Sequence, residues 1–116
     1  MVEALSKELL PSWPEEWLIL ERQRWNHLRL HALEVLADRF AEDGRHMDAV
    51  EAGQAAVTIE PYRESAHRTL IRAYIAEGNS ASALEQYQRC RRLLMHDLGV
   101  RPTEQIQALV ESITDN

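Results

Sequence analysis

The sequence predicts an all-α protein: a tetratricopeptide-like α-α repeat array with a long N-terminal helix and a C-terminal capping helix. Three observations lead to this fold class. The composition is rich in Ala, Leu, Glu and Arg and poor in Gly and Pro, which favours helix. Apolar residues recur at spacings of three and four. Several positions also recur after 34 residues, which is the period of tetratricopeptide repeats.

The first predicted helix is the longest. Ser12 can cap its free amides, Pro14 suits its first turn, and Gly44 supplies a C-terminal stop after Asp43. A bend near residues 22–25 stays open, because the helix is unusually long. The face expected to be buried consists of Trp25, Leu28, Ala32, Leu36 and Phe40. Trp13, Trp17 and Trp25 are expected to form a hydrophobic cap over the repeats, although an aromatic binding box is the alternative.

Four further helices are predicted over residues 46–59, 63–77, 80–97 and 103–114. Pro61, Gly78 and Gly99 end the first three of them, and Thr103 can cap the last. The positions expected to be buried are Ala49, Val50, Gly53, Ala56, Val57, Ala66, Leu70, Ala73, Tyr74, Ala83, Leu84, Tyr87, Cys90, Leu94, Ile106, Leu109, Val110 and Ile113.

The repeat defines the predicted domain organisation. A shift of 34 residues places Gly44 on Gly78, and it also aligns Ala49 with Ala83, Leu36 with Leu70, Ala32 with Ala66, and Phe40 with Tyr74. Residues 1–116 are therefore expected to form one domain with two repeats, at about 30–63 and 64–97. Because two repeats are few for a stable stack, segments 12–29 and 103–114 are expected to act as caps.

Charge and composition limit the classes of function. The net charge is −6, with 13 basic residues mixed among 19 acidic ones, whereas a nucleic-acid-binding face is usually basic. We therefore expect no direct nucleic acid binding. The run Arg89-Cys90-Arg91-Arg92 is interpreted as a solvated face, with a contact to phosphate or an acidic partner as the alternative. The single cysteine and the absence of a long apolar run predict a cytoplasmic protein without a membrane contact.

No catalytic constellation is found, so the protein is not expected to be an enzyme. His27 and His31 have the spacing of two metal ligands on a helix, but spacing places no third ligand beside them. We expect no metal and no cofactor. Cys90 is predicted to be a core residue, with a reactive thiol as the alternative because of its arginine neighbours.

The predicted binding surface is the concave side of the stack, formed by the first helix of each pair. Its candidate partner-binding residues are His31, Glu34, Asp38, Ser65, Arg68, Arg72 and Ile75, and Glu42 is a further candidate. Two interpretations stay open. Glu34 and Asp38 can pair with Arg68 and Arg72 across the groove, or these side chains can face a protein partner.

The chain resembles the bacterial transcriptional activator domain of SARP-type antibiotic regulatory proteins. The residues that carry the resemblance are Glu8-Leu9-Leu10-Pro11, Trp17, Glu21-Arg22, Glu60-Pro61-Tyr62-Arg63-Glu64, Ala66-His67-Arg68, Gly78, Ala83-Leu84, Tyr87 and Leu98-Gly99-Val100-Arg101-Pro102. Lys7 departs from the family pattern, which has a glycine there. The resemblance implies a module that follows a winged-helix DNA-binding domain, contacts a second protomer and helps to engage RNA polymerase.

The expected function is a protein-interaction module of a bacterial transcriptional regulator. Its expected partners are the adjacent winged-helix domain, a second protomer in a possible homodimer, and RNA polymerase. The alternative is a general adaptor module of a signalling ATPase or sensor protein, without a direct transcriptional role.

Overall fold

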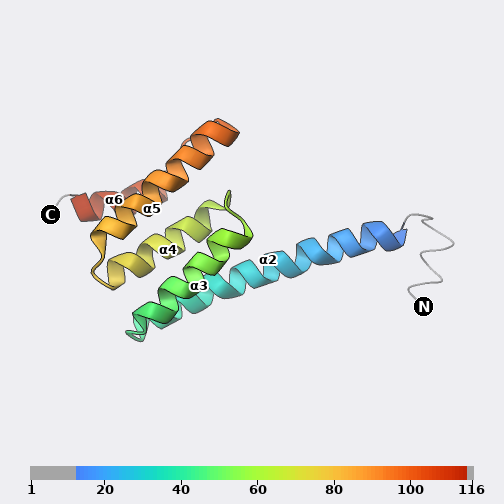
Figure 1. Cartoon of the computed structure of the whole chain (residues 1–116), viewed down its shortest axis with the longest axis horizontal. Coiled ribbons are helices and arrows are strands. Elements are labelled where there is room, and N and C mark those ends of the chain that lie inside the picture. Colours follow the sequence, from blue (N-terminus) through green and yellow to red (C-terminus); the bar gives the residue numbers. More distant parts are fainter. Residues whose placement is uncertain (1–12, 115–116) are drawn as a thin grey trace.

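The computed structural model describes residues 13–114, which form helices joined by short turns and contain no strand. The helices in chain order are α2 (Trp13–Glu42), α3 (His46–Ile59), α4 (Glu64–Ala76), α5 (Ser80–Leu93), the π-helix η1 (Leu94–Leu98) and α6 (Glu104–Thr114). Figure 1 shows α3 beside the second half of α2, then α4, α5 and α6 in succession. The predicted fold class, an all-α tetratricopeptide-like array, is confirmed.

The two turns inside the helix pairs have the same geometry. Gly44 and Gly78 both adopt positive φ, at 78° and 81°, where a side chain would be strained. The Arg45 amide donates to the Phe40 carbonyl at 2.8 Å, and the Asn79 amide donates to the Tyr74 carbonyl at the same distance. The 34-residue shift therefore relates these turns in three dimensions as well as in sequence.

Two apolar clusters form the core. The first joins Leu30 of α2, Ala56 of α3 and Ala66 of α4. The second, between α4, α5, η1 and α6, contains Ile71, Ala83, Cys90, Leu94 and Ile106, all buried. Because α4 contributes to both clusters, it is the central element of the stack, with buried residues on two of its faces.

The burial predicted for α2 is wrong. Trp25, Leu28 and Leu36 are 62%, 52% and 45% exposed, and Ala32 is also exposed. Leu30 and Ala37 are buried in their place. The physical reason is that α2 carries apolar residues on two sides, and periodicity alone cannot say which side meets α3 and α4. Phe40, near the end of the helix, is half-buried.

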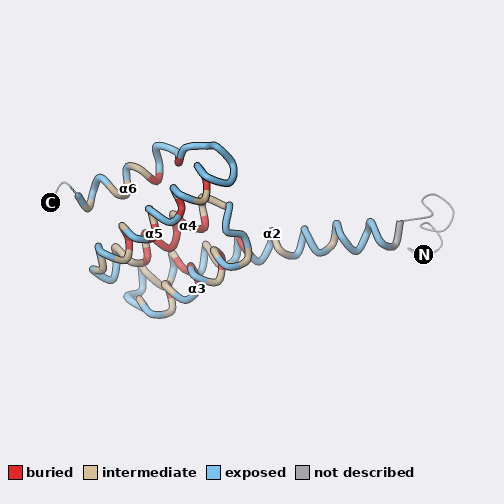
Figure 2. The backbone as a smooth tube through the Cα atoms, turned by 45° about the horizontal axis from the view of Figure 1, so that its top comes forward, coloured by how far each residue is buried: buried red, intermediate tan, exposed pale blue. Residues whose placement is uncertain are grey.

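The tryptophan cap is also not found for the described side chains. Trp25 is mostly exposed and Trp17 is 37% exposed, because the first half of α2 extends beyond the bundle instead of folding over it. Figure 2 shows this half of the helix as a mostly exposed rod. The side chain of Trp13 lies outside the described part of the chain, as do Ser12 and the segment Lys7 to Pro11. The division into two repeats with caps stays a prediction.

The sequence left a break near residues 22–25 open, and α2 runs through this segment without one. The other helices agree with the predicted bounds except in two details. The helix predicted over residues 80–97 changes to π-helical geometry at Leu94 before Gly99 ends it at φ 67°. The hydroxyl of Thr103, expected to cap the last helix, instead donates to Glu64.

The helices α3 and α4 approach each other closely at Gly53. A Cβ atom added there would lie 3.0 Å from the Cα atom of Leu70 and 3.2 Å from its Cβ atom. The backbone of α4 cannot move away without disturbing both core clusters. Small residues on α3, including Ala49 and Ala56, therefore set the distance between α3 and α4.

We expect Gly53→Ala to lower the free energy of unfolding. Overpacking typically costs about 1–3 kcal/mol, and the better helix propensity of Ala offsets about 1 kcal/mol of it. Chemical denaturation followed by circular dichroism measures the change. Glu51→Ala, on the exposed side of the same helix, is the control and should change stability by less than about 0.5 kcal/mol. A Gly53→Ala variant more stable than the parent would contradict the close approach.

Candidate protein-binding surfaces

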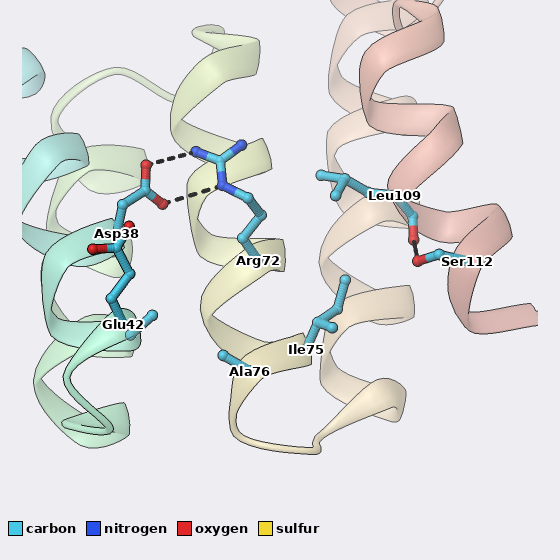
Figure 3. A pocket seen from close by; sticks show the side chains of 8 residues that line it. Asp38, Glu42, Arg72, Ile75, Ala76, Leu109 and Ser112 are labelled. Carbon is cyan, nitrogen blue, oxygen red and sulfur yellow. Dashed lines mark hydrogen bonds and ion pairs between the residues drawn. The ribbon is translucent and has the colours of Figure 1, made fainter.

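A groove of ≈ 540 Å³ lies between α2, α4 and α6. Its lining residues are Asp38, Ala41, Glu42, Arg72, Ile75, Ala76, Leu109 and Ser112. Figure 3 shows α4 at its centre, with Asp38 and Glu42 on one side and Leu109 and Ser112 on the other. Ile75 and Leu109, which belong to the second core cluster, make the groove partly apolar. It lies on the side that the sequence predicts to bind a partner.

One charged pair spans the groove. The guanidinium of Arg72 donates two hydrogen bonds to the carboxylate of Asp38, at 3.1 and 3.0 Å, and Figure 3 shows this fork. Both side chains keep solvent contact, at 37% and 45% exposure. Such an accessible pair contributes little to stability, about 0–1 kcal/mol. A ligand in the groove could therefore pair with Arg72 or with Asp38 in place of the intramolecular partner, and the protein would lose little free energy of unfolding.

Glu34 makes a second pair, but with a different arginine from the one expected. Its carboxylate accepts two hydrogen bonds from Arg63, at 3.1 and 3.3 Å, and one from the Ser65 hydroxyl at 2.6 Å. Burial alone would raise the pKa of Glu34, but the hydrogen bonds from Arg63 and Ser65 lower it overall. Glu34 and Ser65 therefore fix the start of α4 against α2.

Arg68 and Glu64 hold the beginning of α6 against α4. The guanidinium of Arg68 donates to the Gln105 side chain at 2.8 Å. The Glu64 carboxylate accepts the Thr103 amide at 2.6 Å and the Thr103 hydroxyl at 2.5 Å. These polar contacts, together with buried Ile106, place α6 as one wall of the groove.

The structure brings together three of the seven predicted partner-binding residues. Asp38, Arg72 and Ile75 line the groove, and Glu42 joins them. Glu34, Ser65 and Arg68 instead make the intramolecular contacts above, and His31 is exposed on α2. The pairing of Asp38 with Arg72 agrees with one of the two interpretations; the pairing of Glu34 with Arg68 does not occur. The sequence did not predict Leu109 and Ser112 as residues of the binding surface, because only the packing of α6 places them beside α4.

His67 connects α4 to its neighbours from inside the core. Its Nε2 atom lies 2.6 Å from the Pro61 carbonyl oxygen, and its Nδ1 atom lies 2.9 Å from the Gln86 amide nitrogen. The carbonyl can only accept and the amide can only donate, so the ring is neutral with its hydrogen on Nε2. Burial lowers the pKa of His67, and Arg89 nearby contributes in the same direction. This residue stabilises the scaffold that carries the groove.

A second surface lies at the end of α5. The sequence predicts a solvated face there, from the arginine run at residues 89–92. Arg91 and Arg101 line a hollow of ≈ 350 Å³ with Tyr87, Met95, Pro102 and Gln107. Arg91 and Arg92 line an adjoining hollow with Met95 and His96. Within residues 13–114, none of these three arginines forms an ion pair, whereas Arg45, Arg63, Arg68, Arg72 and Arg89 all do. The sequence signal was the run of arginines after Arg89, but Arg101 joins them only through the fold.

The described residues show little chemistry suited to catalysis. Cys90 is buried, and burial together with the charge of Glu64 raises the pKa of its thiol to about 12. It therefore stays protonated at neutral pH, in agreement with a core role. Between residues 13 and 114 no group of three or more His, Cys, Asp or Glu side chains could hold a metal ion. No helix of that stretch is long and apolar enough to cross a membrane.

Comparisons with known proteins give the family. Residues 4–114 match the family described as bacterial transcriptional activator domain. The chain is 34% identical to the regulatory protein AfsR of Streptomyces coelicolor over 106 residues, which is 91% of this chain and 11% of AfsR. It is also similar to two transcriptional regulatory proteins of Mycobacterium tuberculosis. The identity to MoaR1 is 31% over 67% of this chain and 25% of the relative, and that to EmbR is 41% over 56% of this chain and 17% of the relative.

No solved structure gives a significant match. The chain spans only about a tenth of the length of AfsR, so these relatives contain much that the 116 residues do not. The family is one of transcriptional regulators and not a class of enzymes. The resemblance to SARP-type regulators is confirmed, and the chain belongs to the bacterial transcriptional activator domain family.

Proposed function

We propose that this chain is a protein-interaction module of a bacterial transcriptional regulator in the cytoplasm, and that it binds a segment of RNA polymerase in the groove between α2, α4 and α6. Family membership supports the regulatory role. A winged-helix domain and a second protomer are further partners under this proposal. A general adaptor module without a transcriptional role is the alternative.

The groove itself is the observation that supports a peptide-like ligand. It combines the apolar side chains Ile75 and Leu109 with one accessible charged pair, Asp38 and Arg72. Binding sites commonly have an apolar lining and a few polar groups that orient the ligand. A helical or extended segment with apolar residues fits this lining, and a carboxylate on it could share the forked donors of Arg72.

The test is retention of purified bacterial RNA polymerase by the immobilised chain. We expect Ala76→Arg to reduce retention by about tenfold or more, since it fills the groove from an exposed position without removing a contact. Arg72→Glu should have a similar effect, because it removes the fork and faces Asp38 with a second carboxylate. Arg68→Glu is less suitable, since it also disturbs the contact with Gln105.

Arg91→Glu is the control, because it makes the same charge change outside the groove. Equal loss with Arg91→Glu would show that binding depends on general charge or on the second surface, and not on the groove. Failure of the parent chain to retain polymerase would contradict polymerase as the partner and would favour the adaptor alternative. Circular dichroism of each variant checks that the helices are retained.

A further inference from the structure

The second surface carries positive charge that the described residues do not balance. Its two hollows, of ≈ 350 and ≈ 430 Å³, share Arg91 and Met95 and therefore adjoin. Arg101 lines the first hollow, and Arg92 lines the second. Within residues 13–114 no Asp or Glu side chain lines either hollow, whereas two carboxylates line the groove. The second surface is thus complementary in charge to an anionic partner.

The carboxylates nearest in sequence do not neutralise these arginines. The helices α5 and η1 contain two acidic residues, and both already pair with another side chain. Glu85 accepts a hydrogen bond from Arg89 at 3.2 Å, and Asp97 accepts one from the Tyr62 hydroxyl at 2.7 Å. Glu104, in the first turn of α6, lines neither hollow. The guanidinium groups of the second surface are therefore available to a ligand.

Helix dipoles account for only part of this arrangement. Arg91 and Arg92 lie in the last turn of α5, where a cation interacts favourably with the helix dipole. Arg101 instead lies shortly before the N-terminus of α6, where the dipole has the same sign as the guanidinium. Because Arg91 and Arg101 line one hollow, they also repel each other. A bound anion would offset both unfavourable terms.

Apolar side chains at the second surface favour a peptide over a phosphate backbone. Met95 is 42% exposed and lines both hollows, and Tyr87 lines one of them. Leu98 and Val100, which follow Met95 in the chain, are 52% and 48% exposed. A nucleic acid backbone would leave these apolar side chains unused, and the net charge of −6 opposes a long polyanion. A peptide can match both the charge and the apolar area.

The backbone at Met95 supplies an observation that is independent of charge. The π-helix η1 covers Leu94–Leu98 and ends at Gly99 with φ 67°. Segments of π-helix are rare and frequently occur at functional sites. Met95 and His96 both belong to η1, and both line the second hollow. The unusual backbone and the unbalanced charge therefore coincide at the same surface.

We propose that the second surface binds an acidic peptide segment of a partner protein, in which a carboxylate lies beside an apolar side chain. Arg91 and Arg101 donate forked hydrogen bonds to the carboxylates of the peptide. The apolar side chain packs against Met95, whose flexible thioether adapts to the shape of a ligand. None of the described residues lines both this surface and the groove, so the site is additional to the one in the proposed function.

Selection of short random peptides, displayed as a library, against the immobilised chain is the experiment, followed by fluorescence anisotropy of the enriched peptides. We expect the enriched sequences to combine Asp or Glu with a neighbouring apolar residue. Their dissociation constant should rise by about tenfold or more in Arg91→Glu and in Arg101→Glu, and by a smaller factor in Met95→Ala. Replacing the acidic residues of the peptide by their amides should weaken binding in the same way.

Matched control variants separate the second surface from the rest of the chain. Arg29→Glu makes the same charge change on exposed α2, and Met47→Ala truncates an exposed methionine of α3. Both should bind the peptides like the parent, as should Ala76→Arg in the groove. Arg91→Gln and Arg101→Gln remove the charge without adding a carboxylate, and should weaken binding less than the Glu variants. Circular dichroism checks that each variant keeps its helices.

Three results would overturn the proposal. The first is a selection that enriches no acidic sequences, or enriched peptides that bind Arg91→Glu like the parent. The second is equal loss of binding in Arg29→Glu or in Ala76→Arg, which would show dependence on net charge or binding in the groove. The third is a labelled DNA duplex that binds the parent but not Arg91→Glu while no acidic peptide binds, which would assign the surface to nucleic acid.

Discussion

Replacing Ile106 by alanine should lower the free energy of unfolding by about 2–5 kcal/mol, the usual cost of truncating a fully buried Ile. The side chain is 0% exposed and belongs to the cluster of Ile71, Ala83, Cys90 and Leu94. Its loss leaves a cavity at the only fully buried position of α6 among the described residues. Chemical denaturation followed by circular dichroism gives the magnitude.

The same variant tests how the groove is built. Because α6 forms one wall, we expect Ile106→Ala to weaken ligand binding in the groove even where the other helices stay folded. Glu111→Ala is a matched control on the exposed side of α6, and it should change stability by less than about 0.5 kcal/mol. A loss below about 1 kcal/mol for Ile106→Ala would show that α6 is not an integral part of the core.

Replacing His67 by leucine should cost about 2–4 kcal/mol. The Gln86 amide would be buried without its acceptor, which costs about 1–3 kcal/mol, and the hydrogen bond to the Pro61 carbonyl would also be lost. The double variant His67→Leu/Gln86→Leu should recover part of the loss, since it no longer leaves the Gln86 amide buried without an acceptor, although the Pro61 carbonyl loses its donor in both variants. A double-mutant cycle measured by chemical denaturation tests this coupling. Simple additivity would contradict it.

His67 also predicts a pH dependence with a definite sign. Burial lowers the pKa of His67 in the folded state below the ordinary value of 6.5, so the unfolded chain binds a proton first as the pH falls. The stability that the neutral ring contributes is therefore present above pH 6.5 and is lost as the pH falls below that value. His67→Leu should remove this component from the stability profile between pH 7.5 and 5. If His67→Leu left the pH dependence of stability unchanged, the group that binds the proton between pH 7.5 and 5 would not be His67.

The charged groups around His67 come from several elements. Glu64 on α4 favours its protonation and Arg89 on α5 opposes it, while the Pro61 carbonyl accepts from the neutral ring. Glu64→Gln should therefore steepen the loss of stability on acidification, since it removes the favourable charge. It would also weaken the contact with Thr103, so stability at pH 7.5 is the reference for each variant.

The sequence by itself determined the helical fold, the 34-residue repeat and the family. Gly44 and Gly78 are turn residues because only glycine adopts their positive φ without strain, and this requirement is local. The bounds of α3 agree with the prediction, since Pro61 prevents the helix from continuing. Cys90 and Ile106 were assigned to the core correctly, because both lie on helices with a single apolar face.

Tertiary structure alone decided which face of α2 is buried and which groups meet across the groove. An inner helix such as α4 packs on both sides, whereas α2 meets the rest of residues 13–114 mainly through Leu30, Ala37 and their neighbours. The periodicity of the sequence shows which faces of a helix are apolar, but it does not show how many neighbouring helices cover those faces. Likewise, the choice of Arg63 over Arg68 as partner of Glu34 depends on how α4 lies against α2. Such pairings follow from the orientation of helices in space, which no spacing along the chain encodes.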